Sequence, residues 1–321
     1  MKLLRLVPDN TKFRFMRFRF YSFPASLVLA ALCIGLFFTV GLNYGIDFKG
    51  GSLIEMKTNG PADIAEIRSK LSALNLGDVQ VQQFGDPDEV LVRLEQQDGD
   101  EQSQQLAINA VRETFADEVE FRRVEIVGPS VSGELATAGA LGVGVALIGI
   151  LIYVWIRFEW QFAIGAILTT VNDVIVTIGL FVVLQLDFTL SSIAAVLTII
   201  GYSLNDTVVV YDRIRENLRR YKKMPLPELL DLSINETLTR TMMTSVTTLL
   251  ALLALYLFGG EVIQSFTLAM IFGILIGTYS SIFLAAPMLI LFNLRPAGGD
   301  KDDDKDKDKP AEGSAAASRT V

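Results

Sequence analysis

Histidine is missing from this chain, and cysteine occurs once, as Cys33. Without histidine the chain can form neither a zinc site with histidine ligands nor a Ser-His or Cys-His catalytic pair. A single cysteine allows no disulfide within the chain, so a domain translocated across a membrane would have to fold without one. Because histidine is missing, a proton carrier buried in a membrane would have to be a carboxylate.

Two further absences limit what the chain can bind. The net charge is -8, from 28 basic and 36 acidic residues, and this balance argues against a nucleic-acid partner. No G-x-x-x-x-G-K-[ST] stretch is present, so we expect no ATP hydrolysis by the chain itself. Lys49-Gly50-Gly51 lacks that spacing and is typical of a turn. We expect a protein that is not an enzyme and that has no cofactor and no metal site.

Long hydrophobic runs, by contrast, dominate the sequence. Hydrophobic residues make up 51% of the chain and the mean hydropathy is +0.42, which is too apolar for a soluble domain. The apolar residues fall in blocks near the ~20 residues that cross a bilayer. The six blocks are at about 23–42, 135–156, 162–184, 190–211, 241–258 and 266–292. A cleaved signal peptide is the alternative for the first block, but the length of its apolar run favours an uncleaved anchor.

The basic residues predict the orientation of these spans. They cluster in 1–21 and in 212–240, whereas the turns near Asp187 and Glu261 contain none. Because positive residues stay cytoplasmic, both termini are expected inside a bacterial cytoplasmic (inner) membrane. The predicted parts are a basic amino-terminal segment, a first transmembrane helix, a periplasmic domain, transmembrane helices two to six and a disordered cytoplasmic tail. Their ranges are 1–21, 22–42, 43–133, 134–293 and 294–321.

The polar stretch 43–133 alternates strand and helix patterns. Strands are predicted over 53–58, 79–82, 89–95 and 119–127, and helices over 61–74, with Pro61 near its first position, and 101–115. The alternation of the last strand slips at Arg122-Arg123, which indicates a bulge. The order βαββαβ predicts an α+β ferredoxin-like domain. The fold class is thus an α-helical integral membrane protein of six transmembrane helices, with this domain between helices 1 and 2.

Three charged residues inside the apolar blocks are candidates for function, because such charges are costly in a bilayer. They are Asp173, Asp206 and Arg240. Asp206 lies 19 residues after Asp187, and Arg240 lies 21 residues before Glu261. These separations correspond to ~28 and ~31 Å along straight helices, so the two side chains are predicted at nearly the same depth. The pair could be a proton-driven switch, in which protonation of Asp206 releases Arg240, or a static salt bridge between the fourth and fifth spans.

Several neutral residues near these charges are candidates for supporting roles. Asn172 and Asn205 precede the two aspartates, and Thr244 lies one turn after Arg240. They could hydrogen-bond between helices or line a hydrated proton path. Gly273 and Gly277 form G-x-x-x-G, which most often marks close helix packing. A six-span unit with a large first loop is also half the size of transporters built from two related halves, which suggests a homologous partner.

Three stretches carry a resemblance to a known family. They are 45–51 (GIDFKGG), 127–131 (VGPSV) and 201–217, from GYSLNDT to YDRIREN. Together they resemble the bacterial protein-export membrane protein SecF family, of the resistance-nodulation-division superfamily, over the chain up to about residue 295. The resemblance gives Gly45, Asp47, Gly50, Gly51, Gly128 and Pro129 a structural role.

That resemblance also implies partners and a mechanism. Family members pair with SecD, associate with the SecYEG channel and often YajC, and use the proton motive force to export preproteins after the SecA ATPase has started translocation. The span-four aspartate and span-five arginine implicated in proton coupling map to Asp206 and Arg240. Many relatives carry histidine where this chain has Asn172, so Asn172 cannot titrate, and the relay role of Asp173 is weakened. The rival functions are a small-molecule or lipid exporter of the same superfamily, a passive scaffold of the channel, and an intramembrane hydrolase.

Overall fold

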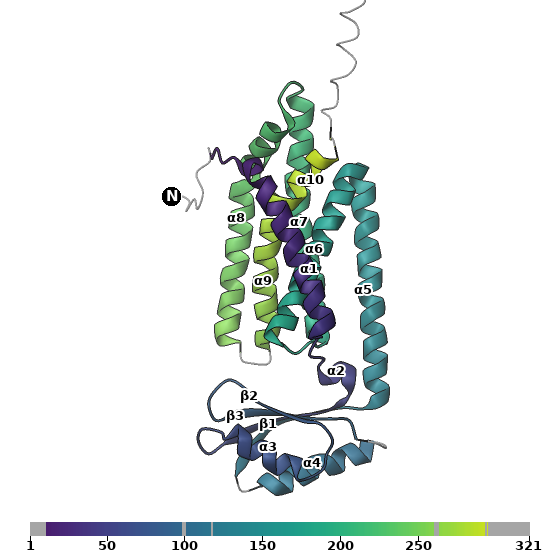
Figure 1. Ribbon diagram of the computed structural model, residues 1–321, viewed down its shortest axis with the longest axis vertical. Coiled ribbons are helices and arrows are strands. Elements are labelled where there is room, and N and C mark those ends of the chain that lie inside the picture. The colour runs from purple at the N-terminus through teal and green to yellow at the C-terminus, as the bar shows by residue number, and fades with distance from the viewer. Residues whose placement is uncertain (1–10, 98–100, 117, 260–262, 293, 295–321) are drawn as a thin grey trace, which may run out of the picture.

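Six long helices stand side by side, and a small sheet domain lies across one end of them (Figure 1). The computed structural model describes residues 11–97, 101–116, 118–259, 263–292 and 294. Within these residues, six helices are long and apolar enough to cross a membrane. They contain α1 (Arg19–Thr39), α5 (Pro129–Arg157), α6 (Trp160–Leu184), α7 (Leu190–Arg220), α8 (Leu226–Phe258) and α9 (Gln264–Ser280). The π-helix η3 (Ser281–Ala285) and α10 (Ala286–Leu291) continue α9. The predicted number of membrane-length apolar helices is confirmed for the described residues, and the predicted tail 294–321 lies almost wholly outside them.

Helices α7 and α8 are longer than the sequence predicts. The stretch 212–240, expected as a basic loop, is helical except around residues 221–225. The reason is a second apolar stripe: Ile214, Leu218, Leu230 and Ile234 are buried between the two helices beyond the apolar spans. The amino-terminal segment closes this far end of the bundle, since the backbone N–H of Met16 donates to Asp231 Oδ1 at 2.9 Å.

The sheet domain has the predicted order of strands and helices. It comprises β1 (Gly51–Thr58), α3 (Ile64–Ser72), β2 (Val79–Gln83), β3 (Glu89–Leu94), α4 (Glu101–Phe115) and β4 (Val119–Val127). The four strands form one antiparallel sheet in the order β2-β3-β1-β4. Helices α3 and α4 cover the sheet face that points away from the bundle (Figure 1). Ile54, Met56, Leu71, Ile108 and Phe115 form the core between them and are fully buried.

Two details of this domain can be compared with the predictions. The bulge is confirmed, because Glu55 pairs with Arg123 while Met56 pairs with Phe121, which leaves Arg122 as the extra residue. The predicted start of the first helix at Pro61 is wrong. Asp63 caps α3 instead, and its Oδ1 accepts the backbone N–H groups of Ala65 and Glu66 at 3.0 Å.

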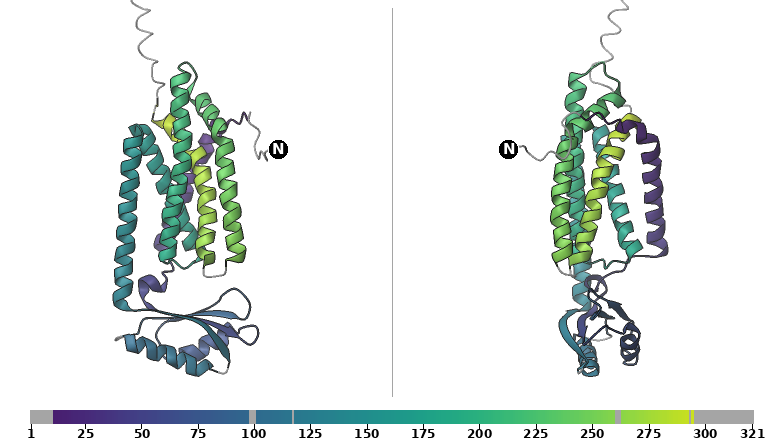
Figure 2. Two further views of the ribbon diagram at one scale, coloured as in Figure 1. Left: turned by 180° about the vertical axis from the view of Figure 1, so that it is seen from behind. Right: turned by 90° about the vertical axis from the view of Figure 1, so that its left-hand side faces the viewer.

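Glycines bring the central helices of the bundle into close contact. A Cβ atom on Gly273 of α9 would lie 2.4 Å from Ile199 of α7, and one on Gly277 would lie 3.0 Å from Ser203. Gly179 of α6 likewise leaves room for Cys33 of α1. The G-x-x-x-G pair thus seats α9 directly on α7. Helix α5 stands apart from the others (Figure 2), and none of its most apolar stretch is buried within the chain.

Candidate functional site

Two buried carboxylates lie within the bundle, one on each of two neighbouring helices. Asp206 of α7 is 6% exposed; its Oδ1 accepts a hydrogen bond from Thr241 Oγ1 at 2.7 Å and its Oδ2 accepts one from Ser281 Oγ at 2.8 Å. Asp173 of α6 is fully buried, and its Oδ2 accepts from Ser203 Oγ at 2.5 Å and from Ser280 Oγ at 2.7 Å. The site therefore joins α6, α7, α8 and the end of α9.

The four donors named above are all hydroxyl groups. A hydroxyl can rotate and act as donor or acceptor, so it can serve an ionised or a protonated carboxyl group. Among the described residues, no basic side chain forms an ion pair with either aspartate. Within the described residues, Oδ1 of Asp173 also has no hydrogen-bond partner. Two such carboxylates in an apolar bundle can take up and release protons without breaking a salt bridge.

Arg240 is placed beside this site but does not enter it. Its side chain is exposed on α8, although its charge is close enough to act on Asp206. The next residue, Thr241, is the one that bonds Asp206. This part of α8 therefore lies level with Asp206, as the counted depths predict, but the predicted contact between carboxylate and guanidinium is not made in this structure.

The predicted supporting residues are spread around the site. Asn172 is half-buried and Asn205 is exposed, so neither shares the burial of the aspartate that follows it. Thr244 is exposed, and its hydroxyl donates to its own helix, at the carbonyls of Arg240 and Thr241. Asn205 and Thr244 take no part in the hydrogen bonds of the carboxylates described above, whereas the side chain of Asn172 lies next to Asp173.

Sequence reasoning missed the two serines of the sixth span. Ser280 and Ser281 are consecutive, yet each bonds a different aspartate. The helix changes from α to π geometry between them. A serine pair followed six residues later by Pro287 was the signal available in the sequence.

The glycine-rich motif after the first span joins the sheet domain to the bundle. It forms the short helix α2 (Ile46–Lys49). The backbone N–H of Gly45 donates to Phe188 O at 2.9 Å, and Asp47 Oδ2 accepts the N–H of Leu190 at 2.9 Å. Leu190 is the first residue of α7, so Asp47 satisfies a free N–H at the start of the helix that carries Asp206.

The other motif residues shape the entry to β1 and α5. Gly50 and Gly51 have φ angles of 73° and 108°, which residues with a Cβ rarely adopt. A Cβ on Gly51 would also lie 2.3 Å from the carbonyl oxygen of Leu94 on the neighbouring strand. Gly128 is the residue before α5, and Pro129 is the first of that helix, a position that proline favours.

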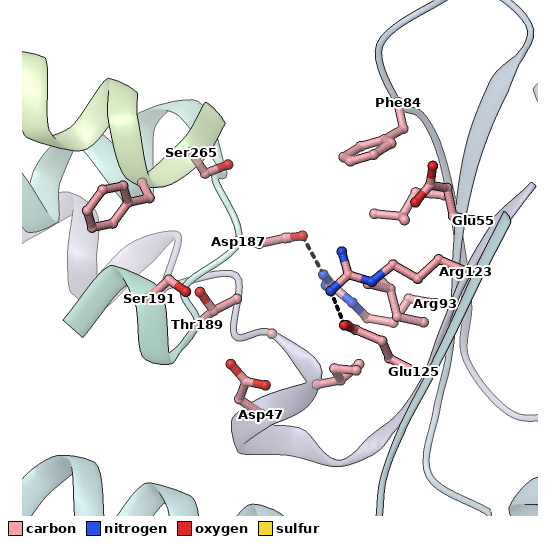
Figure 3. Close-up of a pocket in the computed structure, with 15 residues that line it drawn as sticks. Asp47, Glu55, Phe84, Arg93, Arg123, Glu125, Asp187, Thr189, Ser191 and Ser265 are labelled. Carbon is pink, nitrogen blue, oxygen red and sulfur yellow. Dashed lines mark hydrogen bonds and ion pairs between the residues drawn. The ribbon is translucent and has the colours of Figure 1, made fainter. Parts of the chain in front are cut away.

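A polar contact holds the sheet domain against the bundle. Arg93 of β3 forms an ion pair with Asp187, in the turn between α6 and α7, at 2.7 Å (Figure 3). Asn43 joins both partners: its Nδ2 donates to Asp187 Oδ1 at 2.7 Å and its Oδ1 accepts from Arg93 at 3.3 Å. A cleft of about 260 Å³ surrounds this cluster, with Glu55 and Arg123 on the sheet side. We call Asn43, Arg93 and Asp187 the docking cluster.

We expect Arg93→Gln to loosen the domain from the bundle. The ion pair is largely shielded from water, so losing it leaves Asp187 poorly paired, and amide hydrogen exchange across residues 44–50 should rise about tenfold. Mass spectrometry of the deuterated full chain measures this. The matched control is Lys57→Gln, which breaks the more exposed pair with Asp88. Equal protection in Arg93→Gln and the parent chain would contradict the docking role.

Comparisons with known proteins identify the family. The family model "Protein export membrane protein SecD/SecF, C-terminal" matches residues 107–295, and the "SecD/SecF GG Motif" matches 35–62. The Protein translocase subunit SecF of Rickettsia akari is 45% identical over 294 residues, which cover 90% of this chain and 94% of that protein. The Protein translocase subunit SecDF of Brucella abortus is 49% identical over 302 residues, which cover 94% of this chain.

A solved structure of the same family has a similar fold. The crystal structure of SecDF, a translocon-associated membrane protein from Thermus thermophilus, superposes with a TM-score of 0.81 at 37% identity over 90% of this chain. The chain spans only 40% of that SecDF and 40% of the Brucella SecDF, but nearly all of the Rickettsia SecF. This multi-pass membrane chain therefore belongs to the SecD/SecF family of protein-export membrane proteins.

Proposed function

We propose that the chain is the SecF-type subunit of the Sec translocase accessory complex. In this role it uses the proton motive force to drive preprotein export across the bacterial cytoplasmic membrane after SecA has started translocation. It has no ATPase site of its own. The observation that carries the proposal is Asp206, a carboxylate that is buried at 6% exposure among hydroxyl donors and lies level with the charge of Arg240.

The residues suggest how a proton could do work here. Ionised Asp206 attracts Arg240 through a medium of low dielectric constant, and a proton on Asp206 removes that attraction. The hydroxyl of either Thr241 or Ser281 can then turn to accept the single O–H of the protonated group. Each charge that moves through ~100 mV supplies ~2.3 kcal/mol, which is enough to bias two packings of α7 and α8 over repeated cycles.

A partner subunit would cover the exposed polar face of these helices. Asn205 on α7 and Arg240 and Thr244 on α8 are exposed, although they lie in stretches that cross the membrane. An arginine facing lipid is costly, so SecD packed on this face would stabilise it. The complex would in turn work with the SecYEG channel, with SecA and with YajC.

The proposed orientation follows from the basic residues. Both termini would lie in the cytoplasm, and the basic far end of α7 and the basic turn that follows it would lie there too. The sheet domain, a ferredoxin-like domain by its order of elements, would then be periplasmic, where it could contact emerging preprotein.

Photo-crosslinkers at exposed positions of α3 or α4 should capture a translocating preprotein, and a domain that never captures one would contradict this contact.

The arginine offers a direct test of the proposal. In proteoliposomes containing the chain, SecD and SecYEG, we expect Arg240→Met to lower gradient-driven preprotein release by about tenfold or more. SecA-driven export without a gradient should stay unchanged. Arg240→Lys keeps the positive charge and should restore part of the rate. Normal gradient-driven release in Arg240→Met would contradict the role of this arginine and favour a passive scaffold.

A further inference from the structure

The π-helix η3 interrupts the sixth span between α9 and α10 and has a local cause. Pro287 follows within one turn and lacks the N–H that would bond the carbonyl of Phe283 in an α-helix. The chain widens by one residue before this proline. Such a widened turn inside a helix is often found at a functional site.

Side chains from two other helices bond the carbonyls of this widened turn. Ser22 Oγ of α1 donates to Phe283 O at 3.2 Å, and Tyr211 Oη of α7 donates to Ala285 O at 3.0 Å. Tyr211 is fully buried, and Gly165 of α6 makes room for it, since a Cβ there would lie 2.5 Å from its hydroxyl oxygen. The turn is thus tied to α1 and α7 through its backbone.

Its side chains are tied to the two carboxylates. Ser281 donates to Asp206 at 2.8 Å and Ser280 donates to Asp173 at 2.7 Å. Because these serines share a peptide bond, a backbone shift at one of them also moves the other. A single peptide unit therefore connects a carboxylate of α7 with a carboxylate of α6.

We propose that the π-helix of the sixth span couples Asp206 to Asp173, with Ser281 and Ser280 as positioning residues. This inference rests on the proposed proton-driven function. An ionised carboxylate only accepts hydrogen bonds, whereas a protonated one also donates. Protonation of Asp206 therefore changes the bond with Ser281, the widened turn shifts, and Ser280 changes its bond with Asp173. The hydrogen bonds of Tyr211 and Ser22 carry the same shift to α7 and α1.

Other ionisable groups also lie near this cluster. Arg240 of α8 is close enough to Asp206 to act on its charge, and Tyr211 lies on the same helix as Asp206 but bonds the turn itself. The competing explanation is that the serines only satisfy two buried acceptors. In that case, losing Ser281 would weaken the packing, but the π-helix would still shift when Asp206 is protonated.

A nitrile probe in the turn distinguishes the two explanations. Phe283 is half-buried and stacks on Tyr279 with ring centroids 5.1 Å apart, so p-cyanophenylalanine at position 283 reports movement of the turn. The experiment uses the full chain with SecD and SecYEG in proteoliposomes. Infrared spectra are recorded before and after a proton gradient is imposed, and preprotein release is measured in parallel.

We expect the gradient to shift the nitrile band of the parent protein and to leave it unchanged in Asp206→Asn and Ser281→Ala. Ser281→Ala should also lower gradient-driven release by about tenfold, since it removes a hydrogen bond to a charged group. Ser281→Thr keeps the hydroxyl and should restore both readouts. Thr278→Ala removes a hydroxyl of α9 that bonds Ser245 and neither aspartate, and should match the parent.

Either of two results would overturn the coupling. The first is a nitrile band of the parent protein that does not shift when the gradient is imposed. The second is a Ser281→Ala variant that keeps both the band shift and the release rate. If Asp206→Asn still abolishes release in that case, the proposed function stands and only the coupling is wrong. Normal release in Asp206→Asn would instead refute the proposed function. Should Ser281→Ala fail to accumulate, Pro287→Ala gives the second test, because restoring an N–H at 287 should remove the band shift.

Discussion

Asp206→Asn is expected to lower gradient-driven preprotein release by about a hundredfold or more, with unchanged insertion into the membrane. Asparagine has nearly the same shape and still accepts the hydrogen bond from Thr241, which is 2.7 Å from the carboxylate in the parent chain. It cannot bind or release a proton, however. The structural contacts are therefore largely kept while the proposed cycle is stopped.

Release from proteoliposomes, with and without a gradient, measures this effect. Asp88→Asn is the matched control, because Asp88 forms an ion pair with Lys57 on the sheet domain, far from the buried carboxylates. Surface pairs of this kind contribute little, about 1 kcal/mol or less, so its release rate should match the parent. If Asp206→Asn released preprotein at the parent rate, Asp206 could not be the proton carrier.

Gly51→Ala is expected to destabilise the sheet domain by about 3 kcal/mol or more. Gly51 combines a φ angle of 108° with a Cβ position 2.3 Å from the carbonyl oxygen of Leu94, a backbone atom of the paired strand. Neither problem is relieved by a side-chain rotation, so β1 would have to separate from β3. The docking cluster would then lose the position of Arg93.

Pulse proteolysis of the full chain in detergent, across a urea series, measures the loss. Gly60→Ala is the control, because a Cβ at Gly60 meets no atom within 4 Å. Its stability should stay within about 0.5 kcal/mol of the parent or rise slightly. Equal midpoints for Gly51→Ala and Gly60→Ala would show that the strand start tolerates a side chain.

Most of the architecture could be predicted because it follows from local patterns. The spans follow from apolar runs of bilayer length, and the strands from alternation that even located the extra residue Arg122. The helical extensions at 212–220 and 226–240 were missed, because their charged residues hid an apolar stripe that is buried only when both helices pack together.

The candidate site was only partly predictable for a related reason. Asp173 and Asp206 are conspicuous as isolated charges, but their hydrogen-bond donors come from other spans. Counting residues placed Arg240 at the right depth but could not give the direction of its side chain around α8. Ser280 and Ser281 reach different aspartates from consecutive positions where the helix becomes a π-helix, and these contacts cannot be read from composition. The ion pair between Arg93 and Asp187 depends on how the domain docks.

The most direct test is whether Asp206 changes its protonation when the complex works. Difference infrared spectra of the chain with SecD and SecYEG in proteoliposomes, recorded as a gradient is imposed, report the carbonyl band of a protonated carboxyl group. We predict such a band in the parent protein, its loss in Asp206→Asn and its persistence in Asp88→Asn. A band of equal size in Asp206→Asn would contradict the claim that this carboxylate carries the proton.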